Sequence, residues 1–124
     1  MPYPVVYLKP FAAWLDEQGE DLKLRTLAHL ELLKTRGPLL GRPYADTLKG
    51  SKITNLKELR FQFEGAPIRI LFVFDPKQQA VIMLAGNKQG DKRWYDTNIP
   101  IAEKLYSDHL SEQEKIDAER SNKE

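Results

Sequence analysis

The sequence predicts a single α+β domain, in which helices pack against a small antiparallel sheet. Three observations indicate this fold class. Apolar residues recur every three or four positions before residue 36, they alternate at every second position from Glu58, and helical spacing returns after Asn98. Since 124 residues can bury one compact core and hardly two, we expect one domain over residues 1–124, with frayed last residues.

A strand and two helices are predicted in the N-terminal third. β-Branched and aromatic residues favour a strand over Tyr3–Leu8. Pro10 suits the first turn of a helix, where no amide donor is needed, and this helix should end before Gly19. A second helix is expected over Asp21–Thr35, where leucines fall at three-residue steps.

A long connector separates these helices from the sheet. Residues 37–57 contain three glycines and two prolines, and their apolar residues are too scattered for a regular element. We therefore expect either an ordered connector or a mobile loop. Loops of this length in compact domains are often functional.

Three strands joined by tight turns are predicted next. Alternation of apolar and polar residues indicates a half-buried strand over Glu58–Phe63. Nearly continuous apolar runs indicate two more strands, Ile68–Phe74 and Ala80–Ala85. Because the intervening turns are short and contain glycine or proline, the three strands should form an antiparallel meander.

A final helix should follow a polar loop. Asn98 suits the N-cap position, and Pro100 then falls in the first turn. The apolar face of this helix continues to about Ala118.

The composition excludes several classes of protein. Hydrophobic residues make up 41% of the chain and charged residues 30%, which is typical of a globular domain and not of disorder, collagen or a membrane span. The absence of cysteine removes disulfides, thiolate metal sites and cysteine nucleophiles. The N-terminus has no secretion-signal pattern, so we expect a cytoplasmic protein.

The charge is distributed unevenly along the chain. Residues 37–102 carry ten lysines and arginines against six acidic residues, whereas residues 103–124 carry four against seven. The middle of the chain is therefore +4 and the tail −3. A basic middle is compatible with a polyanionic partner, although its charge density is far below that of a histone.

Two arginines on adjacent predicted strands are the first candidates for chemistry. Arg60 and Arg69 flank the same turn, so they could lie near one another at one end of the sheet. Two guanidiniums on a rigid sheet suit phosphate binding, because the planar fork matches the oxyanion and stays charged. The alternative is that Arg60 forms an ordinary surface ion pair with Glu58 or Glu64.

The loop after the third strand of the meander interleaves basic and aromatic residues. This pattern suits single-stranded RNA, since charge holds phosphates and rings carry unstacked bases. The residues are Lys88, Lys92, Arg93, Trp94 and Tyr95. The alternative is a hydrophobic latch between the sheet and the last helix, which is the favoured reading for Trp94.

Lysines of the connector could extend this basic surface, or they could simply form a solvated face. They are Lys49, Lys52 and Lys57. His29 lies within a leucine-rich helix and His109 on the last helix, so core or surface roles are favoured for both over metal binding or base catalysis. The acids lack the spacing of a two-metal site. If the protein cleaves phosphodiesters, lysine, arginine and tyrosine side chains should do so without metal.

Three stretches resemble a known family. They are RGPLLGRPYADTLKGS, LKELRFQFEGAPIRILFVFD and AVIMLAGNKQGDKRWYDTNIPIAEKLYSDHL, and together they cover most of residues 36–110. They are similar to the RelE/HigB superfamily of toxin-antitoxin toxins, in particular its phage-derived HigB-like branch. The resemblance implies a RelE-like α+β fold: a small twisted antiparallel sheet with N-terminal helices packed on one face, a C-terminal helix, and an opposite face that is basic and open to RNA.

The resemblance also implies an activity and partners. Such toxins cleave mRNA engaged on the ribosome, need no cofactor, and are silenced by a cognate helix-turn-helix antitoxin. DNA contact would occur only through that antitoxin, and no membrane is involved. In such enzymes the 2′-hydroxyl of the substrate attacks the adjacent phosphate, so the protein supplies orientation, charge and proton transfer.

Roles for individual residues follow from the same resemblance. Arg69 would stabilise the phosphorane, Arg60 would position RNA, and Tyr95 would stack or transfer a proton. Phosphate or the leaving oxygen would be stabilised by Lys88, Lys92 or Arg93. RNA would also be contacted by Lys49, Lys52, Lys57 and Trp94. On this basis Arg69→Ala is expected to abolish growth inhibition while leaving the fold intact.

One departure from the family's pattern leaves the identity of the catalytic lysine open. The branch often has two adjacent lysines after the last strand, whereas Asn87-Lys88-Gln89 has one. Two other functions remain possible on the sequence alone. One is a catalytically inactive binding module that acts through an antitoxin and operator complex, and the other is a phage-encoded structural protein with no RNA role.

Overall fold

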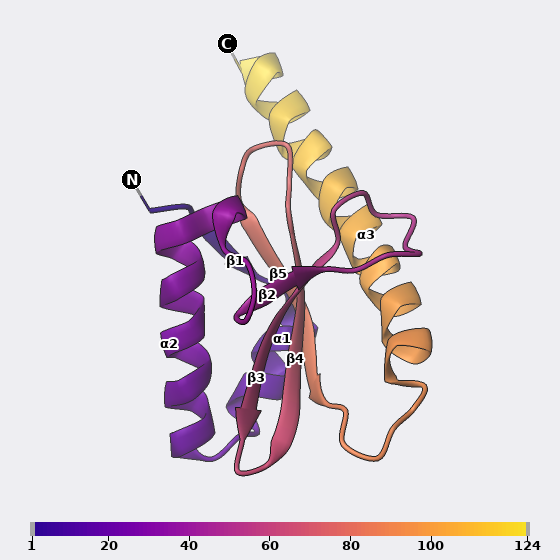
Figure 1. Cartoon of the computed structure of the whole chain (residues 1–124). Helices are drawn as coiled ribbons and strands as arrows, with labels where there is room; N and C mark the ends of the chain where they lie inside the picture. The colour runs from indigo at the N-terminus through magenta and orange to yellow at the C-terminus, as the bar shows by residue number, and fades with distance from the viewer. Residues whose placement is uncertain (1, 124) are drawn as a thin grey trace.

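A five-stranded sheet with strand order β1-β5-β4-β3-β2 forms the centre of the computed structural model, which describes residues 2–123 (Figure 1). In chain order the elements are β1 (Val5–Tyr7), α1 (Lys9–Asp16), α2 (Glu20–Arg36), the 3-10 turn η1 (Gly37–Leu39), β2 (Ala45–Thr47), β3 (Lys57–Phe63), β4 (Ala66–Phe74), β5 (Ala80–Asn87) and α3 (Trp94–Lys123). The predicted α+β class is confirmed.

The meander of β3, β4 and β5 is antiparallel as predicted, and two edge strands extend it. β1 pairs parallel to β5, so the sheet is mixed and not wholly antiparallel. β2 pairs antiparallel with Lys57–Leu59, although its segment was predicted to contain no regular element. Three residues with no apolar alternation give no sequence signal, and backbone pairing with β3 creates this strand.

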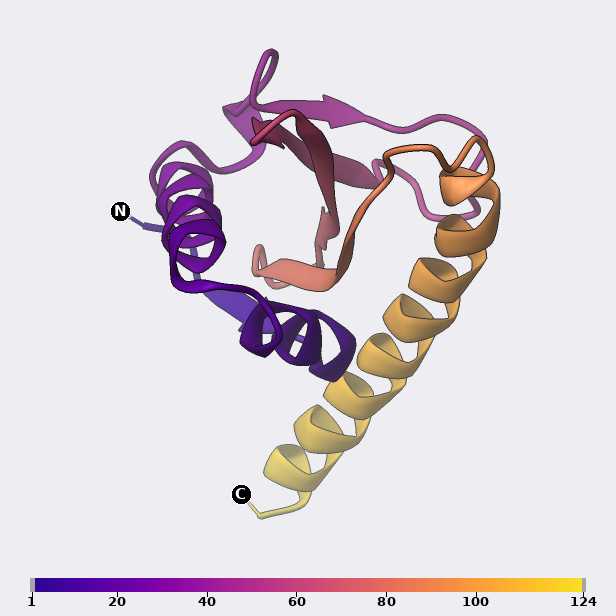
Figure 2. The same ribbon diagram turned by 90° about the horizontal axis from the view of Figure 1, so that it is seen from below.

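Helices cover both faces of the sheet (Figures 1 and 2). On one face, α1 and α2 bury Phe11, Leu30 and Leu33 against odd-numbered residues of β3 and even-numbered residues of β4. On the other face, Trp94 and Ala102 of α3 pack over Leu71 and Met83. The family resemblance implied that this second face would be open to RNA, but α3 covers part of it, so it is open only in part.

A bulge in β5 changes which of its residues face α3. Phe72 pairs with Ile82 and Leu71 with Leu84, so Met83 is the extra residue. Before the bulge the odd-numbered residues of β5 face α3. After the bulge the even-numbered residues, beginning with Leu84, face α3. The bulge thereby turns Gly86 toward α3.

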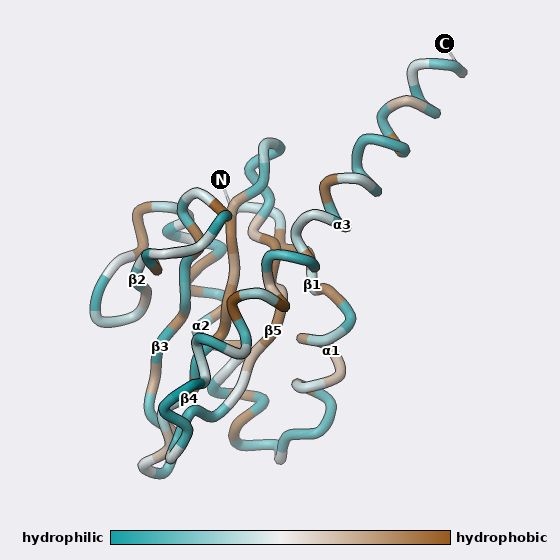
Figure 3. The backbone as a smooth tube through the Cα atoms, turned by 90° about the vertical axis from the view of Figure 1, so that its right-hand side faces the viewer, coloured by the Kyte–Doolittle hydropathy of each residue, from teal (hydrophilic) through white to brown (hydrophobic). Residues whose placement is uncertain are grey.

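The last helix begins earlier and ends later than predicted. It starts at Trp94 and not near Asn98, and Pro100 lies inside it. The carboxylate of Asp91 accepts a hydrogen bond from the Arg93 amide in a turn just before the helix, and Asn98, inside the helix, donates to the Trp94 carbonyl. The helix continues through residues that were predicted to fray and reaches Lys123, so its C-terminal turns extend beyond the sheet (Figure 3). No helix in residues 2–123 is both long and apolar enough to span a membrane.

A buried polar contact anchors the middle of α3. His109 Nε2 lies 2.9 Å from the Asp75 carboxylate in the turn between β4 and β5. Both residues are buried, so His109 has a core role, which is one of the two roles, core or surface, that the sequence favoured. Burial acts to raise the pKa of Asp75, but hydrogen bonds from His109 and Gln79 outweigh it and hold that pKa below its ordinary value.

The depressed pKa predicts acid sensitivity. Because the folded-state pKa of Asp75 lies below the unfolded one, its stabilisation is complete above about pH 4 and is lost as the pH falls through the folded-state value. Asp75→Asn should cost about 2 kcal/mol near neutrality, and the difference from wild type should narrow below pH 4. Urea unfolding between pH 6 and pH 3 measures this difference. The exposed Asp117→Asn, which removes the 2.8 Å pair with Lys77, is the control and should change little.

Candidate nucleic-acid interface

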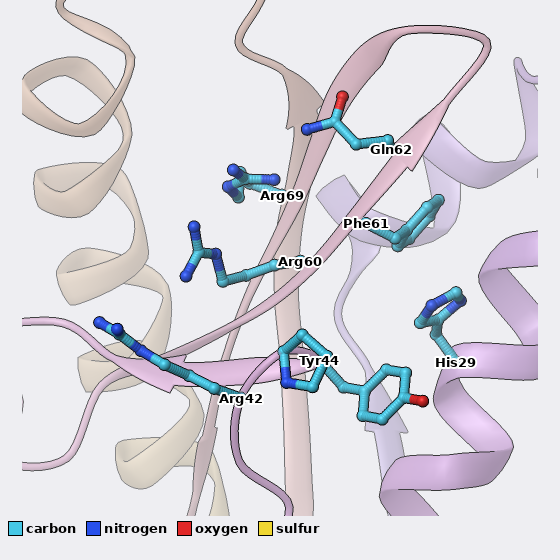
Figure 4. A pocket seen from close by; sticks show the side chains of 8 residues that line it. His29, Arg42, Tyr44, Arg60, Phe61, Gln62 and Arg69 are labelled. Atoms are coloured by element: carbon cyan, nitrogen blue, oxygen red, sulfur yellow. The ribbon is translucent and has the colours of Figure 1, made fainter.

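Arg60 and Arg69 are directly opposite one another on β3 and β4. Their side chains share the α3 face of the sheet, because residues paired across strands point to the same side. Figure 4 shows the guanidinium groups of Arg42, Arg60 and Arg69 one above another on this side. Arg60 and Arg69 therefore lie close together, as the short turn between their strands suggested, and Arg42 from the connector lies on the same side.

A buried carboxylate lies between the two strand arginines. Glu58 Oε2 is 3.6 Å from Arg60 Nε, and Glu58 Oε1 is 3.7 Å from Arg69 Nε. The side chains of Glu58 and Arg69 are only 5% and 7% exposed, whereas that of Arg60 is 34% exposed. Arg69 is thus buried on the face that the family resemblance implied would be basic and open to RNA. The alternative pairing of Arg60 with Glu58 is present, but in a network and not as an isolated surface pair.

Glu58 was not among the predicted site residues. Its sequence signal was its position two residues before Arg60, which places both on one face of a strand. A carboxylate on that face was interpreted only as a possible partner of Arg60. The structure shows that it also contacts a residue from the last helix.

Tyr95 completes the cluster from α3. Its hydroxyl donates a hydrogen bond of 2.7 Å to Glu58 Oε1. Burial, the hydrogen bond to Glu58 and the Glu58 charge raise the pKa of Tyr95, against a smaller opposing effect of Arg69. The phenol therefore stays protonated near neutral pH and can donate a hydrogen bond or a proton.

Lys88 reaches the same cluster. Its Nζ lies 5.6 Å from the centre of the Tyr95 ring, a cation–π distance. The β5 bulge explains this position, since Lys88 is in step with Gly86 and so falls on the α3 face. We define the arginine cluster as Glu58, Arg60, Arg69, Lys88 and Tyr95.

Other predicted RNA contacts are placed differently. Trp94 is buried and packs so closely on Gly86 that a Cβ added at Gly86 would lie 2.8 Å from Trp94 Nε1. Its position between the sheet and the last helix is that of the hydrophobic latch. Lys57 alternates onto the opposite face of β3 and donates to Thr47. Lys92 and Arg93 are exposed immediately before α3.

The connector lysines lie in a segment that α3 holds in place. The Glu103 carboxylate accepts hydrogen bonds from the Lys52 amide at 2.6 Å and the Ser51 hydroxyl at 2.8 Å, and these lower the pKa of Glu103. The side chains of Lys49 and Lys52 remain exposed. The connector is therefore ordered over this part, with its basic groups free to face solvent.

Arg42 and Asp46 form the rim of the site. The Arg42 guanidinium donates to Asp46 Oδ2 at 2.8 Å, and Arg60 Nη1 lies 3.8 Å from the same oxygen. The hydrogen bond from Arg42 lowers the pKa of Asp46, so this carboxylate is charged at neutral pH. Three guanidiniums thus face two carboxylates, and Lys88 adds a further positive charge.

Comparison with known proteins identifies the family. Residues 13–107 match the family described as Phage derived protein Gp49-like. Two Mycobacterium tuberculosis (strain ATCC 25618 / H37Rv) relatives, both named as candidate toxins, are HigB3, 42% identical over 86% of this chain, and HigB2, 41% identical over 82%. The chain covers 93% of the length of HigB3 but only 51% of HigB2.

Solved structures show the same fold at low identity. RelE in the archaeal RelE-RelB complex from Pyrococcus horikoshii OT3 has a TM-score of 0.58 and 17% identity, with 73% of this chain and 99% of that chain covered. The isolated E. coli RelE toxin has a TM-score of 0.55 and 9% identity, with 80% and 98% covered. The architecture is therefore that of the RelE toxins. The chain belongs to the phage-derived Gp49-like family, within the RelE/HigB superfamily of toxins, as the sequence resemblance predicted.

Proposed function

We propose that this protein is a metal-independent endoribonuclease toxin that cuts mRNA on the ribosome and so inhibits translation in the cytoplasm. The observation that carries the proposal is the arginine cluster, where two strand arginines, a lysine and a protonated tyrosine meet on one face of the sheet. Such groups match the charge and the protons that move when a phosphodiester is cleaved.

The reaction would use the 2′-hydroxyl of the RNA as nucleophile. That oxygen loses its proton to water and attacks the adjacent phosphorus, a pentacoordinate phosphorane forms, and the bond to the 5′-oxygen breaks as that oxygen takes up a proton, which leaves a 2′,3′-cyclic phosphate and a 5′-hydroxyl. Arg60, the more exposed arginine, binds the phosphate, while Arg69 contributes positive charge from behind it. In this proposal the Tyr95 hydroxyl, whose proton is donated to Glu58 in this structure, turns to the leaving oxygen and supplies its proton.

Metal independence is part of the proposal. Among residues 2–123, no group of three or more histidine or acidic side chains is arranged to hold a metal ion. The proposal expects cleavage to persist in the presence of a chelator. A chelator-sensitive cleavage would count against this part of the proposal.

A cognate antitoxin is part of the proposal. The similar archaeal RelE was solved as a complex with RelB, and the sequence resemblance implies a small helix-turn-helix antitoxin for this branch. DNA would be contacted only through that antitoxin. Co-expression of the neighbouring reading frame should relieve growth arrest if it encodes the partner.

Tyr95→Phe tests the proposed chemistry. Removing the hydroxyl should lower the rate of mRNA cleavage by about 100-fold, because a positioned proton donor is lost. The accompanying loss of one hydrogen bond to buried Glu58 should cost only about 1–2 kcal/mol of stability. Tyr106→Phe is the matched control, since Tyr106 is also half-buried on α3 with a raised pKa but stacks on His109 away from the cluster.

An inactive binding module is the second candidate, and the burial of Arg69 beside Glu58 favours it. Expression of the wild-type protein without an antitoxin separates the two. Growth arrest with cleaved mRNA supports the enzyme. Normal growth together with salt-dependent RNA binding supports the module.

A further inference from the structure

The edge of the sheet beside the arginine cluster contains a hollow whose aromatic side has no role in the cleavage proposed above. β2 pairs with the first residues of β3, and the last contact is the hydrogen bond of 2.8 Å that the Arg60 amide donates to the Tyr44 carbonyl. Beyond Arg60 this edge of β3 has no paired strand in the part of the chain that the structure describes. The remaining part of β3 is left with a hollow of about 460 Å³ at its edge. We call it the edge hollow, and its lining comprises His29, Arg42, Pro43, Tyr44 and Gln62 together with Arg60, Phe61 and Arg69.

Two kinds of side chain meet across the edge hollow. Figure 4 shows the guanidiniums of Arg42, Arg60 and Arg69 on one side of β3, and the rings of His29 and Tyr44 on the other. One side therefore offers positive charge and the other an aromatic surface. A ligand that fills the hollow would need an anionic part joined to a flat part.

The aromatic side is held firmly from behind. His29 stacks on Phe61 with ring centres 4.3 Å apart and planes 17° apart, and Phe61 belongs to the core. Tyr44 lies next to His29 at 6.3 Å and is 42% exposed. The Tyr44 ring is thus available to a base while its neighbour is fixed by the core.

The cationic side is incompletely satisfied. Within the described residues, Nε of Arg69 and Nε of Arg60 are buried without a hydrogen-bond partner, since their distances to Glu58 exceed hydrogen-bond length. Buried donors without acceptors are costly. Arg42, whose side chain is 75% exposed, has Asp46 as its one ion-pair partner among residues 2–123 and can exchange that carboxylate for a phosphate.

We propose that the edge hollow is a second nucleotide subsite, which binds a nucleotide of single-stranded RNA next to the cleaved bond. The base rests on Tyr44 and His29, and its phosphate binds Arg42 and Arg60. The inference rests on the proposed RNA-cleaving function, because the substrate would continue from the arginine cluster around the edge of β3. An acidic peptide would satisfy the guanidiniums but would make no use of the exposed ring.

Binding of a short RNA that resists cleavage tests the subsite. The probe is a fluorescent 2′-O-methyl hexanucleotide, which lacks the attacking hydroxyl, and binding is followed by anisotropy at low salt. Tyr44→Ala should weaken binding about 10-fold, whereas Tyr44→Phe should retain it, because stacking and not the hydroxyl is used. Tyr7→Ala is the matched control: Tyr7 is 41% exposed on β1, at the opposite edge of the sheet, and its removal should not change binding.

Arg42 provides an independent measurement. Arg42→Gln should weaken binding and reduce its dependence on salt, because one phosphate contact is lost. The control is Lys104→Gln, which removes the other exposed i, i+4 pair, with Asp108, on α3. This control should leave both affinity and salt dependence unchanged.

The outcomes separate the subsite from the proposed function. Equal RNA binding by wild type and Tyr44→Ala overturns the subsite, even if wild type cleaves mRNA. Weaker binding by Tyr44→Ala supports the subsite, even if no variant cleaves and the nuclease proposal fails. Failure of wild type to bind the probe, or Tyr44-dependent binding of a polyglutamate peptide in its place, also overturns the subsite.

Discussion

Arg69→Ala should abolish growth arrest and should also lower the free energy of unfolding by about 3 kcal/mol. The loss of activity, about 100-fold or more, follows from removing a charge beside the developing phosphorane. The loss of stability follows from burial, because the variant leaves the Glu58 carboxylate, 5% exposed, without its nearest buried cation. The sequence led to the expectation that this variant would leave the fold intact, and the burial of Arg69 and Glu58 adds a predicted loss of stability to it.

A second substitution distinguishes the two effects of Arg69→Ala. Adding Glu58→Gln removes the unpaired charge and keeps a carbonyl oxygen for the Tyr95 hydroxyl. The double variant should regain most of the stability, measured by urea unfolding, while growth arrest stays absent. A double-mutant cycle with Glu58→Gln alone gives the coupling between the two residues.

Recovery of toxicity in the double variant would contradict the proposed role of Arg69. Activity that returns with stability would mean that the guanidinium serves only to neutralise Glu58. In that case Arg60 and Lys88, the more accessible cations, would be the groups that meet the phosphate.

The sequence predicted the meander and indicated that Arg60 and Arg69 could lie near one another. Alternation indicated the faces of β3, but the sequence did not fix its register with β4, which the structure provides by pairing Arg60 with Arg69. Burial was not predictable in the same way, since Arg69 lies in a strand that is apolar on both sides and α3 determines how much of it is covered. A helix far along the chain has no local signal in β4.

The positions of Lys88 and Trp94 depend on the bulge in β5. A regular strand over Ala80–Asn87 would have placed Gly86 on the face of α1 and α2. The apolar run of β5 has no period that reveals an extra residue at Met83. The sequence therefore indicated that basic and aromatic residues follow this strand, without indicating on which face they fall.

The edge hollow was missed for a different reason. His29 and Tyr44 are 15 positions apart in segments predicted as helix and connector, and only the pairing of β2 with β3 brings them to one edge. His29 was interpreted as a core or surface residue because its neighbours in the helix are leucines. Its stacking on Phe61 is a tertiary contact, which periodicity does not reveal.

Trp94→Ala should lower the free energy of unfolding by about 4 kcal/mol, which is a large part of the stability of a domain this size. Trp94 is 5% exposed and begins α3, and its ring packs over Gly86 and meets the Tyr95 ring edge-on at 5.3 Å. Its removal would leave a cavity between β5 and α3 and release the helix that carries Tyr95. Thermal and urea unfolding measure the loss.

The same residue decides between the latch and RNA stacking. Trp94→Phe keeps an apolar ring and should cost less than half as much, and the folded variant should bind the 2′-O-methyl probe as wild type does. If Trp94→Ala left the unfolding transition unchanged but weakened RNA binding, stacking would be its role and the latch would be wrong. We expect the reverse, because a ring closed in between Gly86 and Ala102 presents no face on which a base could stack.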